Sequence, residues 1–197
     1  MIDLGFCQID EIKPEDCEAI VNFHRVTRTV TDLSLAPDLA EANIADGFYD
    51  RIWAEHFKTK DKQETKGRAL KVNLEGCIIG IVRYGLIPNL PYEPLVKHGA
   101  HGWGELHQLY IDPAYQNHGL GRTLFIQATQ DLASWGAARM LVRCFRDNSL
   151  TRRFYEHLSA QFLCDELSVV KRNGKNFEIP TSHYVLPNLS DYVRQTS

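Results

Sequence analysis

The spacing of hydrophobic residues changes repeatedly along the chain, and each spacing predicts a type of secondary structure. Apolar residues three or four positions apart are typical of helices, whereas alternation of apolar and polar residues is typical of strands. Helical spacing follows Pro14 and again Pro37, where Gly47 divides the second stretch in two. Strands are predicted at residues 6–12, 69–74, 77–84, 106–111, 139–145, 162–171 and 181–186.

Two further helices are predicted between the later strands, at residues 119–135 and 148–158. Gly136 suits the end of the first, since glycine readily adopts the left-handed conformation found at helix C-termini. The predicted order is strand, two helices, three strands, helix, strand, helix and two strands. This mixed order, with one strand–helix–strand crossover near the middle, favours a mixed sheet that has helices on its faces.

Composition restricts the classes of protein to which this chain can belong. Its 197 residues are 44% hydrophobic and 24% charged, which is enough for one sizeable core. The net charge of −3 and the absence of a dense basic face argue against nucleic acid as a partner. The apolar runs are too short to cross a membrane, and the N-terminal segment lacks the pattern of a secretory signal. We therefore expect a cytoplasmic protein without a membrane partner.

The cysteine and histidine residues form neither a disulfide pattern nor a metal pattern. The 5 cysteines are scattered without a C-x-x-C pair, so reduced thiols in a reducing compartment are expected. His98 and His101 lie three positions apart and His107 follows, but no firm third or fourth ligand is evident. No metal site is predicted.

The segment that carries candidate chemistry runs from a strand through a tight turn into a helix. The strand ends at Asp112-Pro113, and Gln116, Gly119, Gly121 and Arg122 follow. A helix N-terminus presents unpaired N–H groups to an anion, glycine allows close approach of the backbone, and arginine adds a cation. A Walker loop would need lysine after its last glycine, and a Rossmann fingerprint would need three glycines. A plain glycine-rich helix start is the structural alternative.

The whole segment resembles the acetyl-CoA signature of the GNAT superfamily of N-acetyltransferases, Q-x-x-G-x-G/A, which residues 116–121 match. The stretch Asn148 to Tyr155 resembles the N-x-x-A-x-x-F-Y helix of the same family, with Thr151 in place of the usual alanine. The usual Gly-Phe after this helix is missing, because Ser159-Ala160 stand there. The motif match covers residues 105–162.

The resemblance implies an α/β (α+β) fold, with a mixed, mostly antiparallel central sheet of about seven strands flanked by about four helices. It implies a single domain over residues 1–197, whose cofactor-binding core lies at about 104–162. The co-substrate would be acetyl-CoA, with no metal. The strand before the turn would lend backbone groups to the pantetheine arm, and the turn would hold the pyrophosphate. The residues expected to bind the cofactor are Leu109, Tyr110, Ile111, Gln116, Asn117, His118, Gly119, Leu120, Gly121, Arg122, Thr123 and Asn148.

The resemblance also implies catalytic roles. Tyr155 would protonate the departing thiolate as general acid, although a plain core aromatic is the alternative. Glu105 stands at the position of the base in the superfamily's histone-acetylating members, and it is our preferred base. His107, two residues along the strand and so on the same side, is the second candidate, and water is the third. Direct attack needs no acyl-enzyme, and Cys144 lacks the Cys-His arrangement of a thiol nucleophile.

The expected acceptor is a primary amine of a small molecule or a protein. In this superfamily the acceptor cleft would lie between residues 25–57 and 86–103, where Trp53 and Trp103 are candidate walls or ordinary core. Asn148, expected to contact the pantetheine, has the alternative role of capping its helix. A homodimer through the last strands is expected by analogy. The alternative function is a non-catalytic regulatory module that binds acyl-CoA and needs neither catalytic residue.

Overall fold

The computed structural model describes residues 7–61, 66–87 and 102–196, and the seven strands in these ranges form one sheet. The order is β1-β2-β3-β4-β5-β7-β6, and every neighbouring pair is antiparallel except β4 and β5. The strands are β1 (Gln8–Glu11), β2 (Gly67–Leu74), β3 (Cys77–Ile87), β4 (Trp103–Ile111), β5 (Arg139–Phe145), β6 (Gln161–Arg172) and β7 (Lys175–Leu186). The expected mixed, mostly antiparallel sheet is confirmed.

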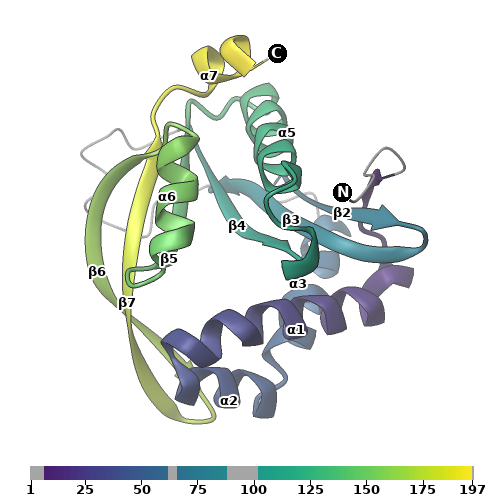
Figure 1. The fold of residues 1–197 in the computed structure, drawn as a ribbon, viewed down its shortest axis with the longest axis vertical. Helices are drawn as coiled ribbons and strands as arrows, with labels where there is room; N and C mark the ends of the chain where they lie inside the picture. Colours follow the sequence, from purple (N-terminus) through teal and green to yellow (C-terminus); the bar gives the residue numbers. More distant parts are fainter. Residues whose placement is uncertain (1–6, 62–65, 88–101, 197) are drawn as a thin grey trace.

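Helices cover both faces of the sheet (Figure 1). One face of β3 and β4 carries α5, with α7 beside it, whereas α1 packs on the other face with α2 and α3 against it. α6 contacts β6. The helices are α1 (Cys17–Leu35), α2 (Pro37–Ala45), α3 (Phe48–Asp61), α5 (Leu120–Ser134), α6 (Ser149–His157) and α7 (Leu189–Thr196), with short 3-10 helices η1 (Pro14–Asp16) and η2 (Pro113–Tyr115).

Alternation along β3 divides the core between the two faces of the sheet. Val82 is buried in the larger core under α5, whereas its neighbour Ile81 is buried under α1 with Trp53. Burial on both faces explains why β3 is a nearly continuous hydrophobic run. Trp103 is buried against Leu141 in a third cluster. Both tryptophans proposed as cleft walls are therefore core residues.

The predicted elements are confirmed, and the differences lie mainly at their ends. Gly47 separates α2 from α3 with φ 59°, and Gly136 follows α5 with φ 94°, as expected for left-handed glycines. β4 begins earlier than the alternation predicted, because Trp103 pairs with Arg139 of β5. α7 was not predicted, and its Leu189 is fully buried. The described residues therefore hold six α-helices where about four were expected.

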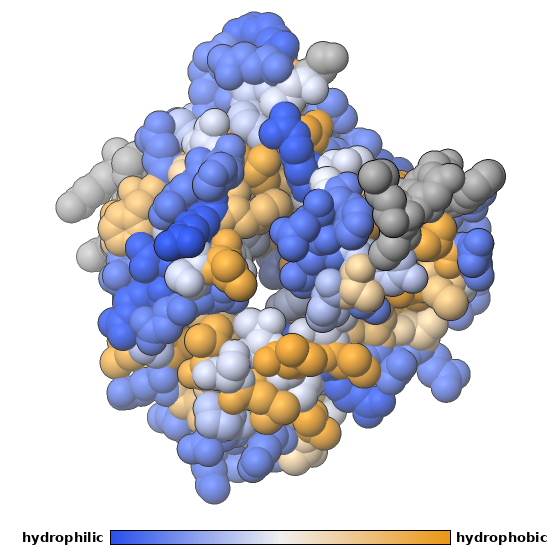
Figure 2. Space-filling view, viewed as in Figure 1, coloured by the Kyte–Doolittle hydropathy of each residue, from blue (hydrophilic) through white to orange (hydrophobic). Residues whose placement is uncertain are grey.

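The surface in Figure 2 is mostly polar, with apolar side chains gathered low in the view, over α1 and α2. Val26, Val30 and Leu33 follow one another along α1 with exposed fractions of 56%, 59% and 50%. Among the helices in the described ranges, none combines the length and the apolar character needed to span a lipid bilayer.

Candidate active site

The sheet opens between its two parallel strands. β4 and β5 pair only as far as Leu106 and Val142, after which β4 continues to Ile111 and β5 continues to Phe145. Beyond that point β4 keeps β3 as its neighbour and β5 keeps β7. The inner backbone edges of both strands therefore border an opening, where side chains leave a cavity of about 360 Å³. The surface is hollowed at the centre of the view in Figure 2.

This main cavity takes its walls from elements that are distant in sequence. α1 contributes to one side, the start of α6 to another, and β6 and β7 close a third. The lining residues for which a role was predicted are Glu105, His107, Leu109, Tyr110, Ile111, Gln116, Asn148 and Tyr155. The structure thus brings Gln116 of the predicted turn and the predicted helix to one opening, whereas residues 117–123 do not line the cavity.

Tyr155 projects from α6 into the wall of the main cavity, and its exposed fraction is 6%. Its ring packs on Phe154, Phe125 and Tyr184, with centroid separations of 5.3, 6.2 and 6.4 Å. Burial raises the pKa of the Tyr155 hydroxyl well above its usual value, and the nearby Cys144 adds to the shift. The hydroxyl therefore stays protonated at neutral pH, as a proton donor must.

The turn between β4 and α5 is held by hydrogen bonds at its two ends. The side-chain amide of Gln116 donates to the carbonyl of Ile111 at 3.0 Å, and the N–H of Thr123 donates to the carbonyl of Gly119 at 3.0 Å. Within the described part of the chain, the backbone N–H groups of residues 117–122 have no hydrogen-bond acceptor. They are the free donors that a helix N-terminus offers to an anion.

The backbone of the turn requires residues that tolerate positive φ. Gly119, the N-cap of α5, has φ 86°, and Asn117 has φ 62°. Glycine adopts this region without steric cost, and asparagine is enriched there. Leu120 is anchored in the core, whereas Arg122 is exposed on the first turn of the helix. The free N–H groups and one cation are therefore presented together.

Two residues of the turn also serve the fold. A Cβ at Gly121 would lie 3.3 Å from the Phe154 ring, so this glycine lets α6 pack closely against α5. The expected use of its missing side chain is close approach of a phosphate, and no local pattern indicates this contact with Phe154. The ring of His118 is tied to the turn, since its Nδ1 lies 2.6 Å from the carbonyl oxygen of Gln116.

Glu105 is held in an ion pair on β4. Arg143 of β5 donates through Nε to Oε1 at 2.9 Å, and Nδ1 of His107 lies 3.5 Å from Oε2. Burial alone would raise the pKa of Glu105, but the contacts with His107 and Arg143 outweigh it and lower the pKa to about 2. Such a carboxylate is ionised at neutral pH and is a weak proton acceptor. The sequence analysis did not single out Arg143 as its partner.

His107 occupies a β-bulge. Tyr84 pairs with Leu106 and Arg83 pairs with Gln108, so His107 has no partner of its own in β3. A simple period of two predicted that His107 would share a side with Glu105, and the bulge interrupts that period. The two side chains nevertheless meet, and the partly exposed imidazole lines the main cavity.

α1 supplies polar side chains to the main cavity that the sequence analysis did not identify. Arg28 donates through Nε to Oδ2 of Asp32 at 2.9 Å, and both residues line the cavity. Asn43 of α2 lies 3.4 Å from the same carboxylate oxygen, and Arg172 of β6 donates to Asn43 at 2.7 Å. These hydrogen bonds connect α1, α2 and the end of β6 around the cavity. Their one sequence signal was the i, i+4 spacing of opposite charges.

Asn148 caps α6. Its Oδ1 accepts a hydrogen bond from the backbone N–H of Thr151 at 3.0 Å, which is the alternative role considered for it. The side chain also lines the main cavity. Its Nδ2 group is therefore the part of the residue that remains for a ligand.

The thiol of Cys144 is a poor nucleophile in this setting. Burial raises its pKa to about 11, so the reactive thiolate is scarce at neutral pH. Within the described ranges, no three His, Cys, Asp or Glu side chains form a group that could hold a metal ion. His98 and His101 lie outside the described residues.

Comparison with known families and structures agrees with this geometry. Residues 34–159 match the Acetyltransferase (GNAT) family. No protein with a curated description matches the chain. Among solved structures, PaiA N-acetyltransferase from Thermoplasma acidophilum, in complex with coenzyme A, is similar with a TM-score of 0.62. The two are 19% identical, and the alignment covers 89% of this chain and 97% of that one.

Two further structures share the fold. The ribosomal-protein-S18-alanine N-acetyltransferase from Escherichia coli has a TM-score of 0.62 at 14% identity, covering 93% of this chain and 94% of that one. YncA from Salmonella typhimurium, with its cofactor acetyl-CoA, has a TM-score of 0.59 at 16% identity, covering 92% and 93%. Such low identities establish the shared fold alone. Because the family match spans more than half of the chain, this chain belongs to the GNAT acetyltransferase family and is an acyltransferase.

Proposed function

We propose that this enzyme transfers the acetyl group of acetyl-CoA to a primary amine of a small molecule or protein by direct attack. One observation carries the proposal: the opening between β4 and β5 is bordered by Gln116 at the turn and by Tyr155 on α6. The turn at Gln116 can bind a diphosphate, and the hydroxyl of Tyr155 can protonate a departing thiolate. We propose that residues 1–197 act as one catalytic domain, with the cofactor-binding core at about 104–162.

The turn would hold the pyrophosphate of the co-substrate. The N–H groups of residues 117–122 are free, and Arg122 adds a cation beside them. A helix dipole alone contributes only about 0.3–1 kcal/mol per charge, so several converging donors are needed. We propose that the inner edge of β4 at Leu109, Tyr110 and Ile111 pairs with the pantetheine arm, because β5 no longer pairs with it there. Nδ2 of Asn148 is a further donor facing the same cavity.

The reaction forms a C–N bond and breaks a C–S bond. The amine nitrogen attacks the thioester carbon, and the tetrahedral intermediate collapses with departure of the coenzyme A thiolate. Tyr155 then donates to the sulfur the hydroxyl proton that it retains at neutral pH, because burial raises its pKa. Alignment of amine and thioester in one cavity contributes roughly 7–11 kcal/mol in a well-oriented pair. The buried thiol of Cys144 has no part in this scheme.

The amine must lose a proton, and we propose that His107 accepts it. Glu105 was our preferred base from the sequence, but a carboxylate with a pKa of about 2 matches neutral pH poorly. His107 lines the main cavity, and an imidazole nitrogen can accept a proton. Glu105 would position the His107 ring through Nδ1, at 3.5 Å, and stabilise the imidazolium that forms. Arg143 keeps the Glu105 carboxylate ionised for this task.

Calorimetric titration with CoA, followed by an acceptor screen with acetyl-CoA that measures free thiol, tests the proposal. We expect CoA to bind and at least one class of amine to accelerate thiol release. Uptake of CoA without acceleration by any amine would favour the non-catalytic regulatory module. No uptake of CoA would refute both.

A further inference from the structure

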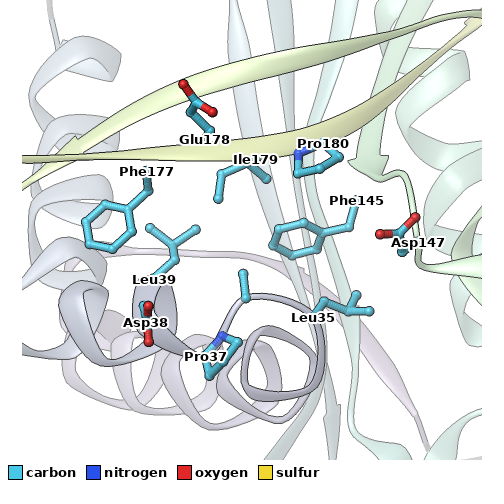
Figure 3. A pocket seen from close by; sticks show the side chains of 11 residues that line it. Leu35, Pro37, Asp38, Leu39, Phe145, Asp147, Phe177, Glu178, Ile179 and Pro180 are labelled. Carbon is cyan, nitrogen blue, oxygen red and sulfur yellow. The ribbon is translucent and has the colours of Figure 1, made fainter.

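A second cavity of about 210 Å³ lies next to the main one. Figure 3 shows it between the junction of α1 with α2, the end of β5 and the middle of β7. We call it the end pocket, and it is lined by Leu35, Ala36, Pro37, Asp38, Leu39, Phe145, Asp147, Phe177, Glu178, Ile179 and Pro180. None of these residues has a part in the chemistry described above.

The end pocket continues the main cavity. Leu39, Phe145 and Ile179 line both. One face of α1 also contributes to both cavities. Arg28, Thr31 and Asp32 line the main cavity, and Leu35 lines the end pocket. These positions are three or four residues apart and so lie on one face of the helix. The end pocket therefore adjoins the cavity that Tyr155 lines, with three residues common to both walls.

The walls of the end pocket are mostly apolar. In Figure 3 the rings of Phe145 and Phe177 flank the pocket, with Leu39 and Ile179 between them. Water occupies about 30 Å³ per molecule, so this volume corresponds to several waters against hydrocarbon walls. Replacing such water with an apolar group of matching shape is favourable. The pocket suits a bulky hydrocarbon substituent.

The charged residues around the end pocket are all acidic. They are Asp38, Asp147 and Glu178, and Figure 3 shows the Glu178 carboxylate directed away from the interior. Asp147 has Arg146 at 3.2 Å, and both side chains are largely exposed. No basic residue lines this pocket within the described chain, whereas Arg28 and Arg143 line the main cavity. A carboxylate carried into the end pocket would therefore meet acidic residues and no basic residue in the lining.

We infer that the end pocket binds an apolar substituent of the acceptor and thereby determines acceptor specificity. The preferred acceptor is a primary amine whose bulky substituent is apolar and carries no anionic group. This inference rests on the proposed function, since it assumes that the amine reaches the opening beside Tyr155. The reaction is the acetyl transfer given above, and the end pocket takes no part in bond making.

The test compares three amines that share one reacting group: ethylamine, phenethylamine and 4-(2-aminoethyl)benzoate. We expect kcat/KM for phenethylamine to exceed that for ethylamine by on the order of tenfold or more. The reason is that a hydrophobic pocket favours a substrate whose apolar group fills it. The kcat/KM for 4-(2-aminoethyl)benzoate, which differs from phenethylamine by one carboxylate, should be close to that for ethylamine. Ala36→Phe fills the pocket and should abolish the preference. Ala45→Phe, on the exposed side of α2, is the matched control and should keep it.

A second variant and a binding measurement keep the inference testable if Ala36→Phe folds poorly. Phe177→Ala removes one wall and should also reduce the ratio of phenethylamine to ethylamine. Calorimetry of phenethylamine with the CoA complex should give a Kd that rises about tenfold in either pocket variant. An unchanged Kd, or equal kcat/KM for all three amines, would overturn the inference. Loss of CoA binding itself would instead count against the proposed function.

Discussion

Arg143 donates a hydrogen bond from Nε to Oε1 of Glu105 at 2.9 Å across the parallel pair β4–β5. The carboxylate expected to act as base is therefore already engaged as the partner of a cation. It lies at the last residues that join the two strands before they separate. The ion pair therefore lies where the two strands begin to separate. Because Glu105 is engaged in it, we propose that His107 accepts the proton.

The first prediction concerns the pH dependence of stability. Glutamate in an unfolded chain titrates near ~4.3, whereas the pKa of Glu105 in the fold is about 2. The fold therefore binds fewer protons in this range, so the stabilisation is complete above about pH 5 and is lost as the pH falls towards 2. Glu105→Gln should lower the free energy of unfolding by on the order of 2–3 kcal/mol at pH 7 and by about half as much at pH 3. Urea titrations at both values measure this, with the exposed Glu41→Gln as control.

The second prediction separates His107 from Glu105 as the base. His107→Gln should lower kcat by about 10²-fold or more, because it removes the proposed proton acceptor. Glu105→Gln should lower kcat by less, because it removes only the carboxylate that positions the imidazole. Rates of both variants with a fixed amine and saturating acetyl-CoA check this. An unchanged kcat in His107→Gln would assign proton acceptance to water.

The third prediction concerns the general acid. Tyr155→Phe removes only the hydroxyl that lines the main cavity, so the affinity for CoA should be unchanged while kcat falls by about 10²-fold. Tyr192→Phe is a suitable control, because Tyr192 also packs on Phe125 but does not line the cavity. Equal kcat values for the two variants would remove Tyr155 from its proposed role.

The fourth prediction divides the two roles of Asn148. Asn148→Asp keeps an oxygen that can cap α6 but loses the amide donor, whereas Asn148→Ala loses both. The alanine variant should lose about 0.5–2 kcal/mol of stability, and the aspartate variant should lose little. If the Nδ2 group binds the co-substrate, both variants should raise KM for acetyl-CoA. A normal KM in Asn148→Asp would restrict this residue to capping.

The fifth prediction concerns the conformation of the turn. Gly119→Ala places a side chain at φ 86° and should weaken CoA binding while destabilising the fold by roughly 1–3 kcal/mol. Gly119→Asn should be tolerated better, because asparagine accepts left-handed conformations. Nothing lies within 4 Å of a Cβ built at Gly119, so a steric contact does not complicate the comparison. Equal effects of the two substitutions would contradict a conformational requirement.

Local patterns in the sequence were enough to predict the strands, most of the helices and a candidate site. Alternation and helical spacing are local properties, so they predicted the strands and most helices, including the division at Gly47. The motif at residues 116–121 lies within one strand–turn–helix unit, so its geometry is also local. Asn148 and Tyr155 belong to one short helix, and the spacing that places them on the cavity wall could be read in the same way.

Which of these groups lie together depends on packing between segments that are distant in the sequence. The separation of β4 from β5 depends on pairing between segments joined through α5, which no local pattern encodes. The low pKa of Glu105 follows from its contacts with His107, which lies in a bulge that alternation does not reveal, and with Arg143, 38 residues away. Leu35 and Phe177 are far apart in the sequence, yet both line the end pocket. Such contacts arise when the sheet packs against its helices, because only packing brings distant side chains into range.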